Sequence, residues 1–561
     1  LVIRSELSGV LVVQGGPGTG KTAVALHRAA YLLYTHRERL ARTGVLLVGP
    51  NRVFLRYIEK VLPSLGETGV VMATPGELLP GVVATFDDAP EVAALKGDVR
   101  MAEVIAAAVR ARQRVPDGPR MLDVEGRQLV LRPHVVANAR AHARRNQRPH
   151  NLARVGYVKE LLDGLVSQYA RELDVQLSSD NRAELLADLR ESRDVRREIN
   201  LTWMPLTPQR LLEDLFADPD KLAVAAPHLD ADQRALLQRD RGSPWTVSDI
   251  PLLDEAAELL GDDDTGGWQV KRIAAQERQA EIEYARGALQ ISGGAGGLVS
   301  AQALADRFSD DGPVLSAAER AAVDRTWAYG HIVVDEAQEL SAMTWRLLMR
   351  RCPAKSMTLV GDIAQTGSAA GARSWSEVLD PYVEGRWRLA ELTVNYRTPA
   401  QVMRLASATL AAAGIEAKPP RSVRDGDTGP QAREFVSGDD AAIVAGVQAE
   451  LDLLGEGRLA VIAPAGLVEP IQAALAAALP AGSVARGAVA LDARVAVLEV
   501  NQAKGLEFDT VVLVEPAQIL AASARGANDL YVAMTRPTQR LLVLHSDPLP
   551  AGMDAGLAAH S

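Results

Sequence analysis

Gly15, Gly20, Lys21 and Thr22 have the residue types and the spacing that bind phosphate groups. Glycines in such a turn let successive backbone N–H groups point at anionic oxygens, and the N-terminus of a following helix adds positive charge. The lysine reaches the β- and γ-phosphates of a nucleoside triphosphate, and the hydroxyl after it holds Mg²⁺. These residues therefore predict a loop that binds a triphosphate together with Mg²⁺.

The segments on either side of this loop fit its chemistry. Residues 8–14 form an apolar run that predicts a buried parallel strand, and apolar residues at helical spacing follow the loop. A strand, a glycine-rich turn and a helix in this order hold the loop backbone against a ligand. We expect the whole loop to contact the nucleotide, namely Gly15, Gly16, Pro17, Gly18, Thr19, Gly20, Lys21 and Thr22.

An acidic pair follows a second apolar strand. Asp335 and Glu336 come directly after the apolar residues of the segment HIVVDEAQE. Carboxylates at the C-terminal edge of a parallel sheet lie where doubly wound folds bind ligands. Asp335 would hold Mg²⁺ through water, and Glu336 would orient and deprotonate an attacking water. The alternative interpretation is an ordinary acidic turn at the end of a strand.

Four later segments hold further candidates. Gln365 follows an apolar strand and is placed to hydrogen-bond the γ-phosphate or the attacking water. Arg397 and Arg536 supply guanidinium groups that would stabilise the charge on a transferring phosphoryl group, and a surface salt bridge is the alternative for each. In QAKGLEFD, the Gly505 backbone can approach phosphate or nucleic acid, and the Glu507 carboxylate can accept a ribose hydroxyl.

The order of the predicted elements indicates an α/β protein. Strands and helices alternate up to about residue 85 and again from about residue 317, which predicts doubly wound parallel sheets. Between these regions the apolar residues follow a helical period, so we expect a large, mainly helical insertion. The segment SGGAGG at residues 292–297 predicts a flexible joint near the end of that insertion.

The composition limits the classes of protein that the chain can belong to. A net charge of −10 over 561 residues gives no overall basic field for nucleic acid, although a local basic groove stays compatible with it. Cys352 is the single cysteine, which excludes a disulfide framework and favours a reducing, cytoplasmic location. No apolar run reaches the length of about 18 residues that spans a membrane, so we expect no membrane partner.

Charge is distributed unevenly within the predicted insertion. Residues 127–154 are basic, whereas residues 213–264 are acidic. An acidic surface of this kind can compete in a nucleic-acid channel by presenting carboxylates where phosphates would lie. The basic stretch would contact nucleic acid. For both stretches the alternative is a set of solvent-exposed helix faces.

Six segments of the chain resemble, in chain order, motifs I to VI of the superfamily 1 helicases of the UvrD/Rep kind. They are GGPGTGKT, VVDEAQ, VGDIAQ, NYR, KGLEFD and YVAMTR. The resemblance implies two RecA-like lobes that hydrolyse ATP with Mg²⁺ in the cleft between them, and a motor stroke made by opening and closing that cleft. It also implies that Tyr396 stacks on adenine and that Arg397 and Arg536 contact the γ-phosphate.

The predicted fold is therefore α/β, with two RecA-like doubly wound parallel-sheet lobes and a large, mainly helical insertion in the first lobe. We expect residues 1–85 and 298–394 to form the first lobe and residues 86–297 to form the insertion. Residues 395–548 would form the second lobe, and residues 549–561 a flexible tail.

The position of the insertion resembles that of HelD, a family of motor ATPases that recycle bacterial RNA polymerase. The segments TWMPLTPQRLLEDLF, WTVSDIPLLDEAAELLG and EIEYARGALQ are similar to the insertion of that family, and GPNRVFLRYIEKVLPSLGE and ATPGEL to its first lobe. The resemblance implies a monomeric cytoplasmic motor that binds core RNA polymerase. The chain begins at Leu1 without the N-terminal coiled coil of that family, so we expect it to be truncated.

Three functions remain open from the sequence. The first is an ATP-driven remodeller that releases RNA polymerase from nucleic acid. The second is a 3′–5′ DNA helicase or translocase of the UvrD/Rep kind, for which DNA is the partner. The third is a polymerase-binding wedge that acts by occupancy, without a need for hydrolysis.

Overall fold

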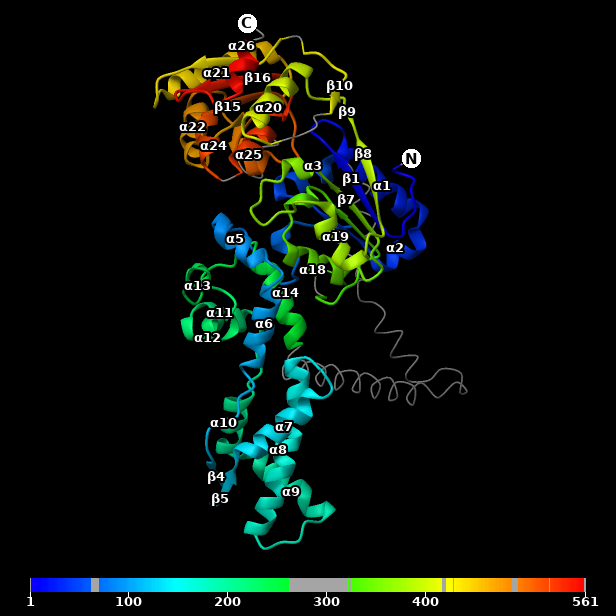
Figure 1. The fold of residues 1–561 in the computed structure, drawn as a ribbon, viewed down its shortest axis with the longest axis vertical. Coiled ribbons are helices and arrows are strands. Elements are labelled where there is room, and N and C mark those ends of the chain that lie inside the picture. The colour runs from blue at the N-terminus through cyan, green and yellow to red at the C-terminus, as the bar shows by residue number, and fades with distance from the viewer. Residues whose placement is uncertain are drawn as a thin grey trace, which may run out of the picture. The chain divides into compact units, whose positions relative to one another are not determined.

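The chain forms two compact units. The computed structural model describes residues 2–61, 70–261, 320–321, 324–415, 420–426, 428–486, 493–523 and 525–558 (Figure 1). The first unit, called here the sheet unit, comprises Leu1–Val99, Pro244–Pro251 and Ser316–Ser561. The second, called here the helical unit, comprises Arg100–Ser243 and Leu252–Leu315.

A six-stranded parallel sheet forms the first lobe of the sheet unit. Its inner strands are short and almost wholly buried, as expected for apolar runs in a parallel sheet that is covered on both faces, whereas the edge strands are partly exposed. In spatial order they are β3 (Val70–Ala73), β2 (Val45–Val48), β6 (His331–Val334), β7 (Met357–Gly361), β1 (Val10–Gly15) and β8 (Trp387–Leu392). The strand β6 pairs with β2, so the chain returns to this sheet after the helical unit.

Helices cover this first sheet and connect its strands. The helices α1 and α3 pack their apolar residues against one face. The bounds of the elements are α1 (Lys21–Thr35), α2 (Arg37–Thr43), α3 (Arg52–Val61), η1 (Pro75–Glu77), α5 (Pro90–Gly97), η2 (Ala337–Glu339), α18 (Ala342–Arg351), η3 (Ile363–Gln365) and α19 (Trp375–Val383).

A polar network is buried in the first lobe. The His331 ring lies between the hydroxyl groups of Ser356 and Thr358, at 2.8 and 2.9 Å. The Arg28 guanidinium donates to the Thr358 hydroxyl and to the backbone carbonyls of residues 2, 3, 5 and 6. Burial, and then the neighbouring Arg28 charge, lower the pKa of His331 to about 3, so this ring is neutral in the folded protein.

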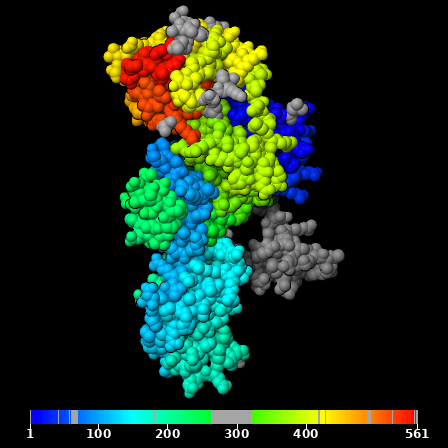
Figure 2. Space-filling view, in the orientation of Figure 1, coloured from blue at the N-terminus to red at the C-terminus, as the bar shows by residue number. Residues whose placement is uncertain are grey.

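A second six-stranded parallel sheet forms the second lobe, which is coloured yellow to red in the space-filling view (Figure 2). In spatial order its strands are β11 (Gln431–Glu434), β16 (Pro537–His545), β15 (Phe508–Val514), β12 (Leu459–Ile462), β14 (Val495–Leu498) and β13 (Val484–Arg486). A two-residue ladder of β9 (Val394–Asn395) and β10 (Arg421–Ser422) lies outside both sheets.

Helices pack on both faces of the second sheet, so this lobe is doubly wound. One face contacts α20, α25 and α26, and the other contacts α21 and α22. The bounds are α20 (Ala400–Ala412), α21 (Asp440–Leu454), α22 (Ala465–Ala478), α23 (Val500–Ala503), α24 (Pro516–Ala521), α25 (Gly526–Met534) and α26 (Met553–Ala558). The predicted α/β fold with two parallel sheets is confirmed.

The helical unit has a core of its own, which is centred on Trp203 and Tyr157. Their rings stack with centroids 5.0 Å apart, and the Tyr157 hydroxyl hydrogen-bonds Thr202. The elements are α6 (Met101–Arg110), β4 (Arg120–Val124), β5 (Arg127–Leu131), α7 (Pro133–Arg144), α8 (His150–Glu172), α9 (Ser179–Glu191), α10 (Arg193–Thr202), α11 (Pro208–Phe216), α12 (Pro219–Ala225), α13 (Ala231–Leu237) and the greater part of α14 (Asp249–Leu260).

Some details differ from the sequence-based division. Residues 86–99, predicted as the start of the insertion, belong to the sheet unit, and β4 and β5 form an antiparallel hairpin within the mainly helical region. The predicted flexible tail includes α26, whose Met553 is fully buried. The predicted joint at residues 292–297 and the segment EIEYARGALQ lie outside the described residues. Among the described helices, none is long and apolar enough to cross a membrane.

Candidate nucleotide-binding site

The loop between β1 and α1 has the backbone that phosphate binding requires. Gly18 and Gly20 have φ angles of 68° and 79°, a region that favours glycine. A Cβ on Gly18 would lie 2.0 Å from the Asn395 side-chain oxygen, so no other residue fits there. The helix α1 begins at Lys21, and its N-terminus therefore faces the loop.

A single cavity of about 30 Å³ joins this loop to side chains from both lobes. From the first lobe, Lys21 and Glu336 line it, and from the second lobe, Arg397 and Arg536. The complete lining is Gly16, Pro17, Gly18, Thr19, Gly20, Lys21, Thr22, Glu336, Arg397, Gly505, Glu507 and Arg536. Most of the residues that the sequence singled out thus meet at one place.

Thr22 and Asp335 form the part of the site that fits a magnesium ion. The Thr22 hydroxyl donates to Oδ2 of Asp335 at 2.7 Å, so two oxygen ligands already lie together. Burial, and then the neighbouring Glu336 charge, raise the pKa of Asp335 to about 7. A divalent cation would offset this uncompensated charge, and Mg²⁺ is commonly held by one or two carboxylates plus substrate phosphates. The residues present therefore fit the ion.

Glu336 is held in a strained conformation as an ionised carboxylate. Its φ angle of 50° is unusual for a residue with a Cβ and costs energy, which is typical of functional sites. Its amide donates to Asp335 Oδ1 at 2.9 Å, and the Gln338 amide donates to Glu336 Oε2 at 2.7 Å. Burial alone would raise the pKa of Glu336, but Lys21, Gln338 and more distant cations outweigh it and lower the pKa. An ionised carboxylate here can accept a proton from water.

The second lobe contributes two arginines in different environments. Arg397 forms an ion pair with Glu507, and both side chains are partly exposed. Arg536 is buried, and its guanidinium donates to the backbone oxygens of Val532 and Leu506 at 2.9 and 3.4 Å. Burial lowers the pKa of Arg536, although the Glu336 charge opposes this effect. Two cations of the second lobe thus face the loop of the first.

Four predicted residues are absent from the lining of this cavity, and one of them, Asp335, is hydrogen-bonded to Thr22, which lines it. The Gln365 amide donates to Asp362 Oδ2 at 2.6 Å, so its side chain is engaged within the first lobe. The Tyr396 ring is exposed, and only its backbone N–H reaches the loop, by donating to the Gly18 carbonyl at 3.1 Å. Gly15 is the last residue of β1 and packs against Leu392 instead. Their proposed contacts with a nucleotide stay predictions.

Two buried amides that the sequence analysis did not assign shape the site. Gln338 holds Glu336 and also accepts the Asp362 N–H at 3.1 Å. The side-chain oxygen Oδ1 of Asn395 accepts the backbone N–H groups of Arg397 and Thr398, at 2.9 and 3.0 Å. These hydrogen bonds fix the turn that presents Arg397. Gln338 lies in VVDEAQ, directly before Glu339, and Asn395 lies in NYR, two positions before Arg397. Their places in these motifs were the available signal.

The second-lobe side of the cavity comes largely from one stretch of chain, which includes Gly505, Glu507 and Arg536. Residues 494–544 match the UvrD-like helicase C-terminal domain. The UvrD-like match thus covers three residues of the cavity and the strands β14, β15 and β16 that position them. This region is therefore similar to the C-terminal domain of a superfamily 1 helicase-type motor.

Among solved structures, the chain is similar to the C-terminal domain of a possible DNA helicase from Lactobacillus plantarum WCFS1. It is 20% identical over 28% of this chain and 91% of that chain, with a TM-score of 0.22. A TM-score this low carries no weight for fold or function. The search of curated proteins found no match to the chain.

Proposed function

We propose that the chain is an ATP-hydrolysing motor of the superfamily 1 helicase type. The observation that carries the proposal is the shared cavity in which Lys21 and Glu336 of one lobe meet Arg397 and Arg536 of the other. A triphosphate is larger than this cavity of about 30 Å³, so binding would require Arg397 and Glu507 to separate. The bound triphosphate would then be contacted from both lobes, and its hydrolysis would remove contacts that hold the lobes together. The UvrD-like match over residues 494–544 supports the same reading.

Each residue of the site has a proposed role. The loop N–H groups and Lys21 would bind the β- and γ-phosphates, and Thr22 and Asp335 would hold Mg²⁺. Bound Mg²⁺ would neutralise charge on the phosphate oxygens. Glu336 would take a proton from the attacking water, while Arg397 and Arg536 would stabilise charge on the transferring phosphoryl group. A phosphate would compete with Glu507 for the Arg397 guanidinium, because these two side chains are paired here.

The remaining predicted residues would complete the nucleotide site. Tyr396, whose ring is exposed, would stack on adenine. Glu507 would accept a ribose hydroxyl once Arg397 turns to the phosphate, and the Gly505 backbone would approach the nucleotide closely. Gln365 would need to leave Asp362 in order to reach the γ-phosphate or the attacking water.

For the partner, we propose core RNA polymerase in the cytoplasm, with the chain acting as a monomeric motor that releases polymerase from nucleic acid. The support is the resemblance of the insertion to HelD and the separate core of the helical unit. The acidic stretch gives less support than its composition suggests. Asp214 is within 3.5 Å of the guanidinium groups of three arginines, and Asp254 and Glu255 are buried.

The leading alternative is a DNA helicase or translocase, and the UvrD-like match favours it as much as the polymerase motor. The two are separated by ATPase assays with and without single-stranded DNA, together with co-purification against core polymerase. A helicase turns over much faster with DNA, with binding that weakens steeply as salt rises. A polymerase remodeller responds little to DNA and is retained by core polymerase.

A further inference from the structure

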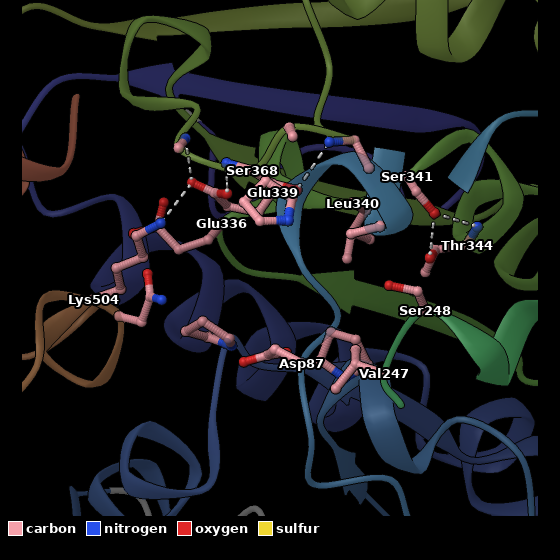
Figure 3. A pocket seen from close by; sticks show the side chains of 18 of the residues that line it. Asp87, Val247, Ser248, Glu336, Glu339, Leu340, Ser341, Thr344, Ser368 and Lys504 are labelled. Carbon is pink, nitrogen blue, oxygen red and sulfur yellow. Dashed lines mark hydrogen bonds and ion pairs between the residues drawn. The ribbon is translucent and has the colours of Figure 1, made fainter. Parts of the chain in front are cut away.

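Glu339 links the C-terminal end of β6, where the candidate catalytic residue Glu336 lies, to the second lobe. It is the last residue of η2, three positions after Glu336. Its two carboxylate oxygens accept the backbone N–H groups of Gly367 and Ser368, at 2.9 and 2.7 Å, within the first lobe. The same carboxylate accepts a hydrogen bond from Lys504 of the second lobe at 3.1 Å (Figure 3).

Lys504 has a second acidic partner in its own lobe. Its ammonium lies 3.7 Å from Oδ1 of Asp529 in α25. Lys504 is 9% exposed, and burial alone would lower its pKa, but Glu339 and Asp529 outweigh burial and raise it. The ammonium is therefore charged and has one partner in each lobe. If the lobes separated, it would lose Glu339 and keep Asp529.

Both residues of this contact are close in sequence to residues that line the nucleotide cavity. Lys504 precedes Gly505, and Glu339 follows the Glu336–Gln338 hydrogen bond within one short turn. The turn at Gly505 is tightly packed, because a Cβ there would lie 2.6 Å from the Phe54 ring of the first lobe. A shift at either end of the contact would thus reach a residue that lines the cavity.

Close packing on the first-lobe side makes the contact specific. A Cβ on Gly367 would lie 2.8 Å from both the Lys504 ammonium and Oδ1 of Asp529. Arg525 of the second lobe also donates to the Thr366 carbonyl at 3.0 Å. The segment 366–368 is therefore the first-lobe surface against which Lys504 is seated.

We propose that Glu339 and Lys504 are positioning residues that set the closed arrangement of the two lobes. Their hydrogen bond forms when the arginines of the second lobe face the phosphate loop, and Lys504 keeps only Asp529 when the lobes open. Neither side chain lines the small cavity at the phosphate loop, although both line a neighbouring cavity of about 380 Å³ together with Glu336, and we assign them no part in bond making or breaking. The inference rests on the proposed ATPase function.

Steady-state ATPase kinetics on the full chain test this role. Lys504→Met and Glu339→Gln should each lower kcat about tenfold and leave KM for ATP within about twofold, because the contact acts in closure rather than in the first binding of ATP. The double variant should lose no more than either single variant, and Lys504→Arg should recover most of kcat. Asp529→Asn, the matched control that removes the same-lobe partner, should not lower kcat.

Additive losses in the double variant would overturn the proposal, since two independent structural defects add whereas one shared contact does not. A loss in Asp529→Asn as large as that in Lys504→Met would also overturn it.

Amide hydrogen exchange separates failure of this proposal from failure of the proposed function. In the wild type, the N–H groups of Gly367 and Ser368 should exchange slowly, and both Glu339→Gln and Lys504→Met should speed their exchange. Unchanged exchange in both variants would reject the contact while leaving an active ATPase intact. A wild type with no ATPase activity but with these exchange differences would reject the proposed function instead.

Discussion

The Thr22 hydroxyl donates a 2.7 Å hydrogen bond to Asp335 Oδ2, although 313 positions separate the two residues in the chain. Thr22 lies at the start of α1, which follows β1, and Asp335 directly follows β6. The strands β1 and β6 are not neighbours in the first sheet. A hydroxyl and a carboxylate held together beside a phosphate loop are the protein oxygens that a nucleotide-bound Mg²⁺ uses.

Thr22→Ala is expected to raise the Mg²⁺ concentration needed for half-maximal nucleotide binding by at least about tenfold, since one ligand is lost. Titration of Mg²⁺ against a fluorescent ATP analogue measures this value. Thr22→Ser keeps the hydroxyl and is the matched control, so it should behave like the wild type. Equal Mg²⁺ dependence in all three proteins would contradict the magnesium assignment.

Lys21→Ala is expected to weaken ATP binding about 100-fold, because charge-assisted bonds to the phosphates are lost. Its ammonium donates to the Gly16 carbonyl at 3.3 Å, a long contact that phosphate oxygens would replace. Isothermal titration calorimetry with the Mg²⁺ complex of a non-hydrolysable analogue gives the affinity. Lys159→Ala, an exposed lysine of the helical unit, is the control. An unchanged affinity in Lys21→Ala would remove the loop assignment.

Glu336→Gln is expected to lower kcat about 1000-fold while ATP still binds, because the proposed general base is lost but the phosphate contacts remain. The same variant separates a motor from a wedge. If it still releases core polymerase from DNA at the wild-type rate, occupancy is sufficient and the motor proposal is wrong. Glu377→Gln, at the exposed start of α19, provides the control for a carboxylate-to-amide change in the same lobe.

The buried His331 should make the first lobe sensitive to acid. Its folded-state pKa of about 3 lies below the value of about 6.5 for an unfolded chain, so below pH 6.5 the unfolded state binds a proton that the folded state excludes. Stability is therefore lost as the pH falls from 6.5 towards 3, and the loss from this group is about 2 kcal/mol at pH 5.

Urea unfolding of the wild type and of His331→Gln at pH 7 and pH 5 measures this contribution. The variant has no titrating ring, so its free energy of unfolding should fall by about 2 kcal/mol less than that of the wild type between the two pH values. Equal losses in both proteins would show that the ring is protonated in the folded state.

Features encoded by short segments were predictable from the sequence. The phosphate loop needs glycines with positive φ beside a lysine, and the apolar run before it forms β1, as the pattern indicates. The acidic pair was predictable for the same reason, because Asp335 directly follows the buried residues of β6.

Features set by long-range contacts were not predictable. The hydrogen bond from the Gln14 amide to the Asp362 carboxylate joins residues 348 positions apart in the chain. The same carboxylate accepts the Gln365 amide, and the predicted contact of Gln365 with a phosphate stays a prediction. The contact between Glu339 and Lys504 spans 165 positions and depends on how two separate sheets face each other, which no local pattern reports.

The most direct test of the account is a crystal structure of the full chain with Mg²⁺ and an ADP–aluminium fluoride complex. The account predicts one nucleotide whose fluoride group contacts Lys21 from the first lobe and the guanidinium groups of Arg397 and Arg536 from the second. A nucleotide bound elsewhere, or one bound to the loop while both arginines stay with their protein partners, would contradict the central claim.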